Sequence, residues 1–195
     1  MQIIAEIGWN HMGDMNLAKK MIDSASKNGA DICKFQTWSE KYLTAGPWDT
    51  DGRREIYKKA QLSYDQHLEL KEYCKKKNVK FLTSIFNKID LDFLLKINPE
   101  IIKIPSHEIY NMNLIENCLI KFDKVLISTG ASKWKEIEMI GKMKNKDKII
   151  RLSNSLSGVI GKLMPPPISK GEFFWGAPIR PKVRLITPSL SSHFT

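Results

Sequence analysis

The chain has 195 residues, of which 42% are hydrophobic and 27% charged, which is ordinary globular composition and excludes a chain that is disordered throughout. The formal net charge is +10, and half of this excess lies in residues 149–195, where six Lys and Arg accompany the single acid Glu172. Elsewhere basic and acidic residues alternate in helical runs without aromatic residues spaced for base stacking. We therefore expect solvated helix faces and no nucleic-acid surface, with a nucleic-acid-binding tail at 149–195 as the alternative.

Short apolar runs, each followed by a segment of helical periodicity, indicate alternating strands and helices. The predicted strands are residues 2–8, 31–37, 79–84, 100–106, 124–129 and, more weakly, 148–153. Gly29 is placed to end the first helix, and Ser63 with Gln66 has the spacing of a capping box that opens a later one. The other helices are predicted within residues 91–97, 111–120 and 134–143. Because the strand interiors are nearly all apolar, we expect a parallel sheet buried on both faces.

Two stretches depart from this alternation of strands and helices. Residues 38–57 are too long and too rich in Gly, Trp, Asp and Arg for a minimal connection, so we expect a functional loop in which Arg53 and Arg54 could close over an anion. After residue 153 the alternation stops, and residues 154–195 hold six of the nine prolines. A complete (β/α)8 barrel needs about 250 residues. The sequence thus predicts an α/β fold, an incomplete (β/α)8 TIM barrel of five to six units in residues 1–153, with an atypical Pro-rich basic segment at 154–195.

The three cysteines lie far apart in the sequence, at positions 33, 74 and 118, without metal-like spacing. The opening "MQIIAEIG" lacks the basic region and the long apolar core of a signal peptide, and no stretch approaches the ~20 apolar residues of a membrane span. We therefore expect a reduced, cytoplasmic protein without a membrane segment.

Polar residues collect at the carboxyl ends of the predicted strands, the edge that carries the active site in parallel α/β proteins. Lys34 and Gln36 alternate on one face of the second strand, and Lys103 interrupts the fourth. A lysine that points inward from an apolar strand is costly unless it meets an anion. With hydroxyl donors nearby, these lysines indicate a site for phosphate or carboxylate, and the hydroxyls are those of Ser84, Ser106 and Ser128.

Two carboxylates and two histidines stand near the same edge. Glu6 and Glu108 are candidates for general acid/base work or hydroxyl binding, or else they are internal counterions of the two lysines. His11 and His107 could ligate a metal, although a lone histidine more often caps a loop or satisfies a carbonyl.

The motifs together carry a resemblance to a known family. The opening "IIAEIGWNHMGDMNLAKKMIDSASKNGADICKFQTW", followed by "FLTSIF", "IKIPSHEIYNMNLI" and "VLISTGAS", resembles the sialic acid synthase (NeuB) family over about residues 2–150. That family includes N-acetylneuraminate, pseudaminic acid and legionaminic acid synthases. The resemblance implies a (β/α)8 barrel enzyme, a transferase that condenses phosphoenolpyruvate with an N-acetylated amino sugar, releases phosphate and uses Mn²⁺ or Mg²⁺.

The resemblance also implies roles for single residues. It assigns Glu6 and Glu108 to the reacting centre and the sugar hydroxyls, and it assigns phosphoenolpyruvate to Lys34, Gln36, Ser84, Lys103, Ser106 and Ser128. In the family's sixth-strand motif only Asn154 is retained, as a substrate contact, within "RLSNSL". The family's "GSGE" reads "PSHE" here, and its "STP" reads "TSI".

The metal site is the least complete part of the resemblance. Of the family's metal histidines only the second has a counterpart, His193 in "SSHFT", as a weak candidate, and the small C-terminal domain through which the family dimerises is not evident. We therefore expect a synthase that can form a homodimer and whose segment 154–195 is a truncated or frameshifted remainder of the barrel. The alternatives are an inactive relic that still binds an anion and another phosphoenolpyruvate-dependent sugar-acid synthase.

Overall fold

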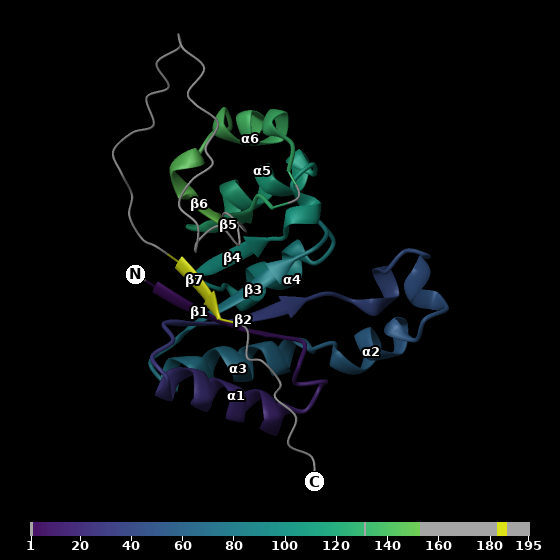
Figure 1. Cartoon of the computed structure of the whole chain (residues 1–195), viewed down its shortest axis with the longest axis vertical. Coiled ribbons are helices and arrows are strands. Elements are labelled where there is room, and N and C mark those ends of the chain that lie inside the picture. Colours follow the sequence, from purple (N-terminus) through teal and green to yellow (C-terminus); the bar gives the residue numbers. More distant parts are fainter. Residues whose placement is uncertain (1, 131, 153–182, 187–195) are drawn as a thin grey trace.

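The structure is a computed structural model, and it describes residues 2–130, 132–152 and 183–186. Figure 1 shows strands and helices in alternation along this part of the chain. The strands are β1 (Gln2–Gly8), β2 (Ile32–Thr37), β3 (Lys80–Ile85), β4 (Ile101–Ile104), β5 (Val125–Ser128), β6 (Ile149–Leu152) and β7 (Val183–Ile186). The helices are α1 (Met15–Lys27), α2 (Arg53–Ala60), α3 (Tyr64–Lys76), α4 (Leu91–Ile97), α5 (Met112–Lys121) and α6 (Trp134–Gly141). Short 3-10 turns are η1 (Glu40–Tyr42), η2 (Pro47–Asp49), η3 (Ser106–Glu108) and η4 (Lys146–Lys148).

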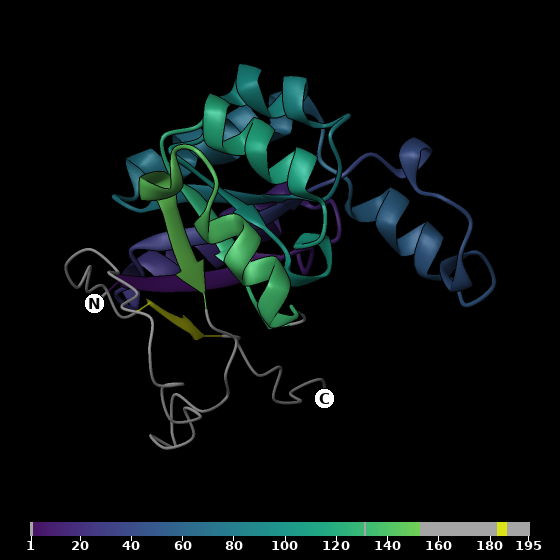
Figure 2. The same ribbon diagram turned by 90° about the horizontal axis from the view of Figure 1, so that it is seen from above.

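The strands form one sheet in which all neighbours are parallel, in the order β6-β5-β4-β3-β2-β1-β7. The first six strands therefore follow one another in chain order, as consecutive units of a (β/α)8 barrel do. Figures 1 and 2 show the sheet curving with its helices on the outer side. The predicted α/β fold, an incomplete TIM barrel of five to six units, is confirmed, and the predicted strands lie within one residue of their observed bounds, apart from β4, which ends two residues early.

One strand was not expected from the sequence pattern. Val183–Ile186 forms β7, which pairs with the free edge of β1 so that Gln2 lies opposite Val183 and Ala5 opposite Ile186. A run of four residues is too short to show strand periodicity in sequence, and it gains its hydrogen bonds only because the edge of β1 is available. The predicted end of the strand pattern at residue 153 is therefore wrong at this place.

The main core lies between the sheet and the outer helices. Cys33 and Phe35 of β2 point into it and meet Ala18 and Ile22 of α1, all four of them buried. Asp14 caps α1, and Ser63 and Gln66 form the predicted capping box of α3. Gly29 follows the last turn of α1 with φ +81°, the left-handed conformation expected where a glycine ends a helix. No helix in the described ranges is long and apolar enough to cross a bilayer.

The connection from β2 to α3 is a folded lobe, which we define as residues 38–61. The segment that was predicted as a functional loop contains η1, η2 and the two-turn helix α2, and it projects away from the barrel in both views (Figures 1 and 2). The sequence did not reveal these turns, because the lobe is held by polar contacts and its residues show no long apolar periodicity. Gly13, with φ +81°, packs so closely on α2 that a Cβ there would lie 2.2 Å from the carbonyl oxygen of Lys59.

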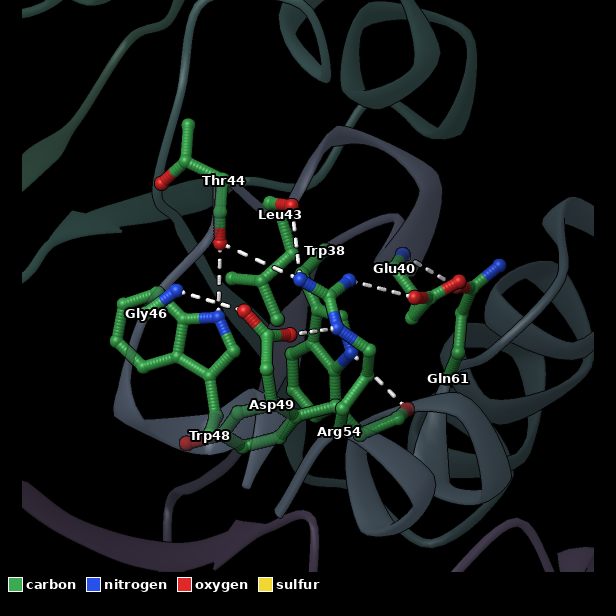
Figure 3. A network of polar contacts seen from close by, with 10 residues as sticks. Trp38, Glu40, Leu43, Thr44, Gly46, Trp48, Asp49, Arg54 and Gln61 are labelled. Carbon is green, nitrogen blue, oxygen red and sulfur yellow. Dashed lines mark hydrogen bonds and ion pairs between the residues drawn. The ribbon is translucent and has the colours of Figure 1, made fainter. Parts of the chain in front are cut away.

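Arg54 organises this lobe (Figure 3). Its guanidinium forms ion pairs with Asp49 and with Glu40, the latter at 2.7 Å, and donates to the carbonyl oxygens of Leu43 and Thr44 at 3.3 Å. Asp49 and Glu40 accordingly raise the pKa of Arg54. The neighbouring Arg53 pairs with Asp51 at 2.7 Å. Both arginines thus bind carboxylates of their own lobe, where the sequence had suggested that they close over an anion.

Candidate functional site

The inner face of the curved sheet is built in layers. Its floor is a cluster of buried apolar side chains, one from each of five strands: Ile4, Ile32, Leu82, Ile101 and Leu126. Two residues further along each of these strands, and so on the same face, stand Glu6, Lys34, Ser84, Lys103 and Ser128. We call these five residues the polar layer. The register pairs Glu6 with Lys34 and Ser84 with Lys103, but it is offset by two residues between β2 and β3 and between β4 and β5, as in a barrel whose strands are staggered. Alternation along each strand therefore places the five predicted site residues on one inner face above an apolar floor.

A buried ion pair lies at the centre of the polar layer. The ammonium of Lys34, whose side chain is 3% exposed, is 2.5 Å from Glu6 Oε2 and donates to Ser84 Oγ at 3.4 Å. Glu6 and Lys34 stand opposite each other in the β1–β2 register. Of the two expected roles of Glu6, the contact with Lys34 is that of a counterion. A buried ammonium needs such a partner, because an unpaired charge in the interior is expensive.

For the second lysine of the layer, Lys103, the described residues provide no carboxylate at ion-pair distance. Lys103 lies opposite Ser84 in the β3–β4 register. Burial and the repulsion of Lys34 lower the pKa of Lys103 to about 8, against the opposing attraction of Glu6. Near neutral pH the layer therefore carries two ammonium groups and one carboxylate, an excess of positive charge that an anion would balance.

Two oxygen atoms of the layer are buried without a protein hydrogen-bond partner in the described part of the chain, Glu6 Oε1 and Ser128 Oγ. Gly8, with φ +58°, lies beside the first of them, and a Cβ there would stand 3.4 Å from Glu6 Oε1 and 3.8 Å from Gln36 Nε2. The lack of a side chain at Gly8 thus leaves room where Glu6 and Gln36 approach each other. Buried polar atoms without partners are uncommon in proteins and are satisfied when water or a ligand enters.

The remaining predicted residues of this edge lie in η3, directly after β4. Ser106 begins this turn and Glu108 ends it. Glu108, whose side chain is 14% exposed, accepts a hydrogen bond from Asn111 Nδ2 at 3.2 Å, and its Oε1 is 4.0 Å from Nε2 of the exposed His107. Glu108 therefore does not pair with either lysine of the polar layer.

His11 serves the loop after β1. Its ring is buried, its Nδ1 accepts the backbone N–H of Gly13 at 3.0 Å, and it packs against Phe35 with ring centroids 6.0 Å apart. Burial lowers the pKa of His11. The loop-capping role that the sequence left open is the one seen, and it fixes the turn that links β1 to α1.

A buried hydrogen-bond chain behind the polar layer was missed by the sequence reasoning. His67 Nδ1 must donate to the carbonyl oxygen of Ser63 at 2.8 Å, because a carbonyl can only accept, and Nε2 therefore accepts from the hydroxyl of Thr37 at 2.8 Å. Thr37 in turn accepts from Thr83 at 2.7 Å. Burial lowers the pKa of His67 to about 4, so the ring is neutral. The chain ties α3 to the ends of β2 and β3, next to Gln36 and Ser84.

A sequence signal for His67 existed. It lies three and seven residues before Leu70 and Cys74, on the buried face of α3. A histidine on such a face requires a buried hydrogen-bond partner. Its hydroxyl partner Thr37, however, lies on β2, which only the fold brings near.

The described residues do not supply a metal site, since they contain no group of three or more His, Cys, Asp or Glu side chains placed to hold an ion. The donor set at the polar layer agrees with this, because its one carboxylate already faces an ammonium. Asn154 and His193, the last two predicted site residues, lie outside the described residues.

Comparisons with known proteins agree with this geometry. Residues 21–153 match the sequence model of the NeuB family. The chain is 35% identical over 147 residues to the N,N'-diacetyllegionaminic acid synthase of Campylobacter jejuni, an alignment that covers 70% of this chain and 44% of that protein. It is also 35% identical over 150 residues to the N-acetylneuraminate-9-phosphate synthase of Drosophila melanogaster, covering 71% of this chain and 40% of that one. The chain thus spans less than half the length of these relatives.

Solved structures give the same result for the fold. The N-acetylneuraminic acid synthetase of Leptospira borgpetersenii, in complex with citrate, superposes with a TM-score of 0.69 at 33% identity, over 78% of this chain and 54% of that one. The phospho-2-dehydro-3-deoxyheptonate aldolase (DAHP synthase) of Thermotoga maritima superposes with a TM-score of 0.60 at 17% identity, over 77% of this chain and 41% of that one. The second likeness shows only that the fold is shared.

Proposed function

The chain belongs to the NeuB family, and on that premise we propose that it is a sialic or related nonulosonic acid synthase. The proposed reaction joins phosphoenolpyruvate to an N-acetylated amino sugar of the N-acetylmannosamine kind and releases phosphate. One observation carries the proposal for this chain: Lys34 and Lys103 stand with Ser84 and Ser128 on one inner face, above an apolar floor. That arrangement suits a small ligand with a phosphate and a carboxylate.

The polar layer has a clear task in this reaction. The two ammonium groups bind the phosphate and the carboxylate, while the hydroxyls of Ser84, Ser106 and Ser128 and the amide of Gln36 donate to the remaining oxygens. Carbon 3 of phosphoenolpyruvate attacks the aldehyde carbon of the open-chain sugar, water adds at carbon 2, and the bond from carbon 2 to the phosphate oxygen then breaks. Positive charge fixed beside the phosphate stabilises it as a leaving group.

The two carboxylates complete the proposed roles. Glu6 lies against Lys34 and is placed to take a proton from the adding water, since its Oε1 is buried and free of protein donors in the described residues. Glu108 is proposed to bind sugar hydroxyls, with Asn111 holding its other oxygen. The divalent metal of the family would polarise the aldehyde, but the described residues do not form its site, and none of these roles depends on it.

Several further features belong to the same proposal. Residues 1–153 form the synthase unit and 154–195 a separate segment, with Asn154 as a substrate contact and His193 as a weak metal candidate. A homodimer in the cytoplasm is expected, and three buried free thiols are compatible with a reducing compartment, those of Cys33, Cys74 and Cys118. The alternatives are another phosphoenolpyruvate-dependent sugar-acid synthase and an inactive relic that binds the anion without turnover.

Calorimetric titration with phosphoenolpyruvate tests the anion site. Each charge-assisted contact is worth roughly 1.5–3 kcal/mol, so the double variant Lys34→Ala, Lys103→Ala should bind about a hundredfold more weakly or worse. Lys80→Ala is the matched control, because Lys80 pairs with Glu100 at the other end of β3. Equal affinity of the wild type and the double variant would refute the assignment.

Phosphate release then separates the alternatives. The synthase requires both an N-acetylated amino sugar and Mn²⁺ for release, whereas the relic binds phosphoenolpyruvate and releases nothing. Release with a different aldehyde, and none with the N-acetylated sugar, would identify the other class of synthase.

A further inference from the structure

Lysines gather at the amino-terminal end of the parallel sheet, opposite the polar layer. Because all the strands are parallel, each connection from a helix to the next strand reaches this end. We define the basic face as five such connections, each taken from the last two residues of the helix to the first residue of the strand: residues 26–32, 75–80, 96–101, 120–125 and 140–149. Together they hold twelve lysines, four acids and no arginine.

The excess of positive charge is confined to this end of residues 1–148. The rest of that range holds thirteen Lys and Arg against sixteen Asp and Glu. Outside the lobe, the connections that lead from a strand to a helix, at the opposite end of the sheet, carry two lysines and three acids. The half-barrel is therefore polarised along its strands, with a positive field at the amino-terminal end that attracts anions.

Most lysines of the basic face are not used inside the chain. Two of the twelve form ion pairs, Lys77 and Lys80, and Lys148 donates to a backbone carbonyl oxygen at 3.1 Å. The other nine are exposed and have no ion pair within the described residues. Their ammonium groups are thus available to a partner outside the chain.

Stabilisation of helix ends accounts for only part of this charge. A lysine in the last turn offsets the negative end of the helix dipole, and five of the twelve lie in such turns of α1, α3, α4 and α5. The last turn of α6 has no basic residue, yet four lysines follow it, with Asp147 as the only acid before β6. Like charges at this spacing repel one another, a cost that an external anion relieves.

The chemistry of the basic face favours a lipid surface over a nucleic acid. Ile120, the second-last residue of α5, is 61% exposed and precedes Lys121. At a bilayer surface, lysines meet the lipid phosphates while an apolar side chain enters the boundary of the acyl chains. Nucleic acid offers phosphates but no such apolar layer. The face also lacks arginine for bidentate phosphate contacts, and its one aromatic residue, Phe122, is buried and cannot stack on a base.

We propose that the basic face attaches this protein peripherally to the surface of a membrane that contains anionic phospholipids. With the amino-terminal end of the sheet on the bilayer, the polar layer at the carboxyl end faces away from the lipid and stays open to solutes. The proposal is independent of the proposed function, because it concerns the opposite end of the sheet and a different partner.

Sedimentation of the full chain with vesicles measures this attachment. Vesicles of phosphatidylcholine alone are compared with vesicles that contain about 30% phosphatidylglycerol, in about 50 mM and about 500 mM NaCl. The wild type should sediment only with the anionic vesicles, and the high salt should release it.

Two variants test the two kinds of contact. Each lysine near an anionic bilayer strengthens binding about fivefold, so the triple variant Lys142→Gln, Lys144→Gln, Lys146→Gln should bind roughly a hundredfold more weakly. Ile120→Ser keeps the charge and should weaken binding about tenfold, because it removes the apolar contact.

The control is a second triple variant, Lys20→Gln, Lys58→Gln, Lys135→Gln. It removes the same charge from exposed lysines of α1, α2 and α6 that lie outside the basic face, and both triple variants keep residues 149–195 unchanged. The control should keep most of the wild-type binding. Unfolding in urea, with equal midpoints for all the variants, shows that folding does not decide the result.

Four results would overturn the proposal. These are no sedimentation of the wild type with anionic vesicles, equal sedimentation with neutral ones, and an equal loss of binding in the two triple variants. The fourth is tighter binding to duplex DNA than to the vesicles, lost on changing the same three lysines, which would assign the basic face to nucleic acid.

Discussion

Replacing Thr37 by valine tests the buried hydrogen-bond chain behind the polar layer. Valine has nearly the shape of threonine but neither donates nor accepts. The change therefore leaves His67 Nε2 without its donor and the Thr83 hydroxyl without its acceptor, and both side chains are buried. The neighbouring Gln36 and Ser84 would lose the support that fixes the ends of β2 and β3.

The magnitude follows from the two groups left unpaired. A buried polar group without a partner costs about 1–3 kcal/mol, so Thr37→Val should lower the free energy of unfolding by roughly 2–4 kcal/mol. Thr83→Val removes only the hydrogen bond that Thr37 Oγ1 accepts, because Thr37 still donates to His67. This variant should therefore cost about 1 kcal/mol. The double variant leaves only His67 Nε2 unpaired and should cost less than the sum of the two single changes.

Urea unfolding followed by circular dichroism measures these differences. With an m-value of about 2 kcal/mol/M, Thr37→Val should lower the midpoint by roughly 1–2 M. A Thr37→Val midpoint within about 0.3 M of the wild type would refute the reasoning. So would a Thr83→Val variant less stable than Thr37→Val, because the direction of the hydrogen bonds would then be wrong.

The same chain predicts a pH dependence. The pKa of His67 is lowered by burial from 6.5 to about 4, so the unfolded chain binds more protons than the folded one between these values. The stability that depends on neutral His67 is complete above pH 6.5 and is lost as the pH falls toward 4, about 3 kcal/mol in all. His67→Gln, which does not titrate, should lose that part of the slope; an unchanged slope in this variant would contradict the assignment.

Three further predictions concern the polar layer and the first loop. The pKa of Lys103 is lowered from 10.5 to about 8, so the charged form of this lysine destabilises the fold. Lys103→Met should therefore raise the free energy of unfolding in urea at pH 7 by about 1–3 kcal/mol, and this difference should vanish above about pH 10.5. In calorimetry the same variant should bind phosphoenolpyruvate at least tenfold more weakly. Glu6→Gln leaves the buried ammonium of Lys34 unpaired and should cost about 3 kcal/mol, and a further Lys34→Met change should recover most of it; no recovery in the double variant would mean that the ion pair is not the cause. Gly13→Ala and Gly29→Ala both place a side chain at φ +81°, costing about 1–2 kcal/mol, but only Gly13→Ala also clashes with α2, so its melting temperature should be clearly the lower of the two.

The strands and most helices could be predicted from local patterns. The apolar runs and the caps at Ser63 and Gly29 act over a few residues, and parallel β/α units repeat them. The folded lobe could not be predicted in this way. Arg54 binds Glu40 and Asp49, fourteen and five residues away, and no periodicity marks such polar contacts.

The candidate site was predicted in part. Lysines interrupting apolar strands marked Lys34 and Lys103, because a charge in an apolar run must be compensated. The sequence left open which carboxylate does so, and the β1–β2 register decided it by placing Glu6 opposite Lys34. His67 was missed because the hydroxyl that donates to its ring, that of Thr37, lies 30 residues away in the sequence.

By itself the sequence determined the repeating β/α units, the parallel sheet and the kinds of side chain at its carboxyl edge, since backbone conformation and alternation are local properties. Only the tertiary structure decided which of those side chains meet. Strand register stacked a charged layer on an apolar floor, and the parallel sheet brought lysines from five connections to its opposite end. These are distances between segments far apart in the chain, and they depend on how the sheet closes and packs.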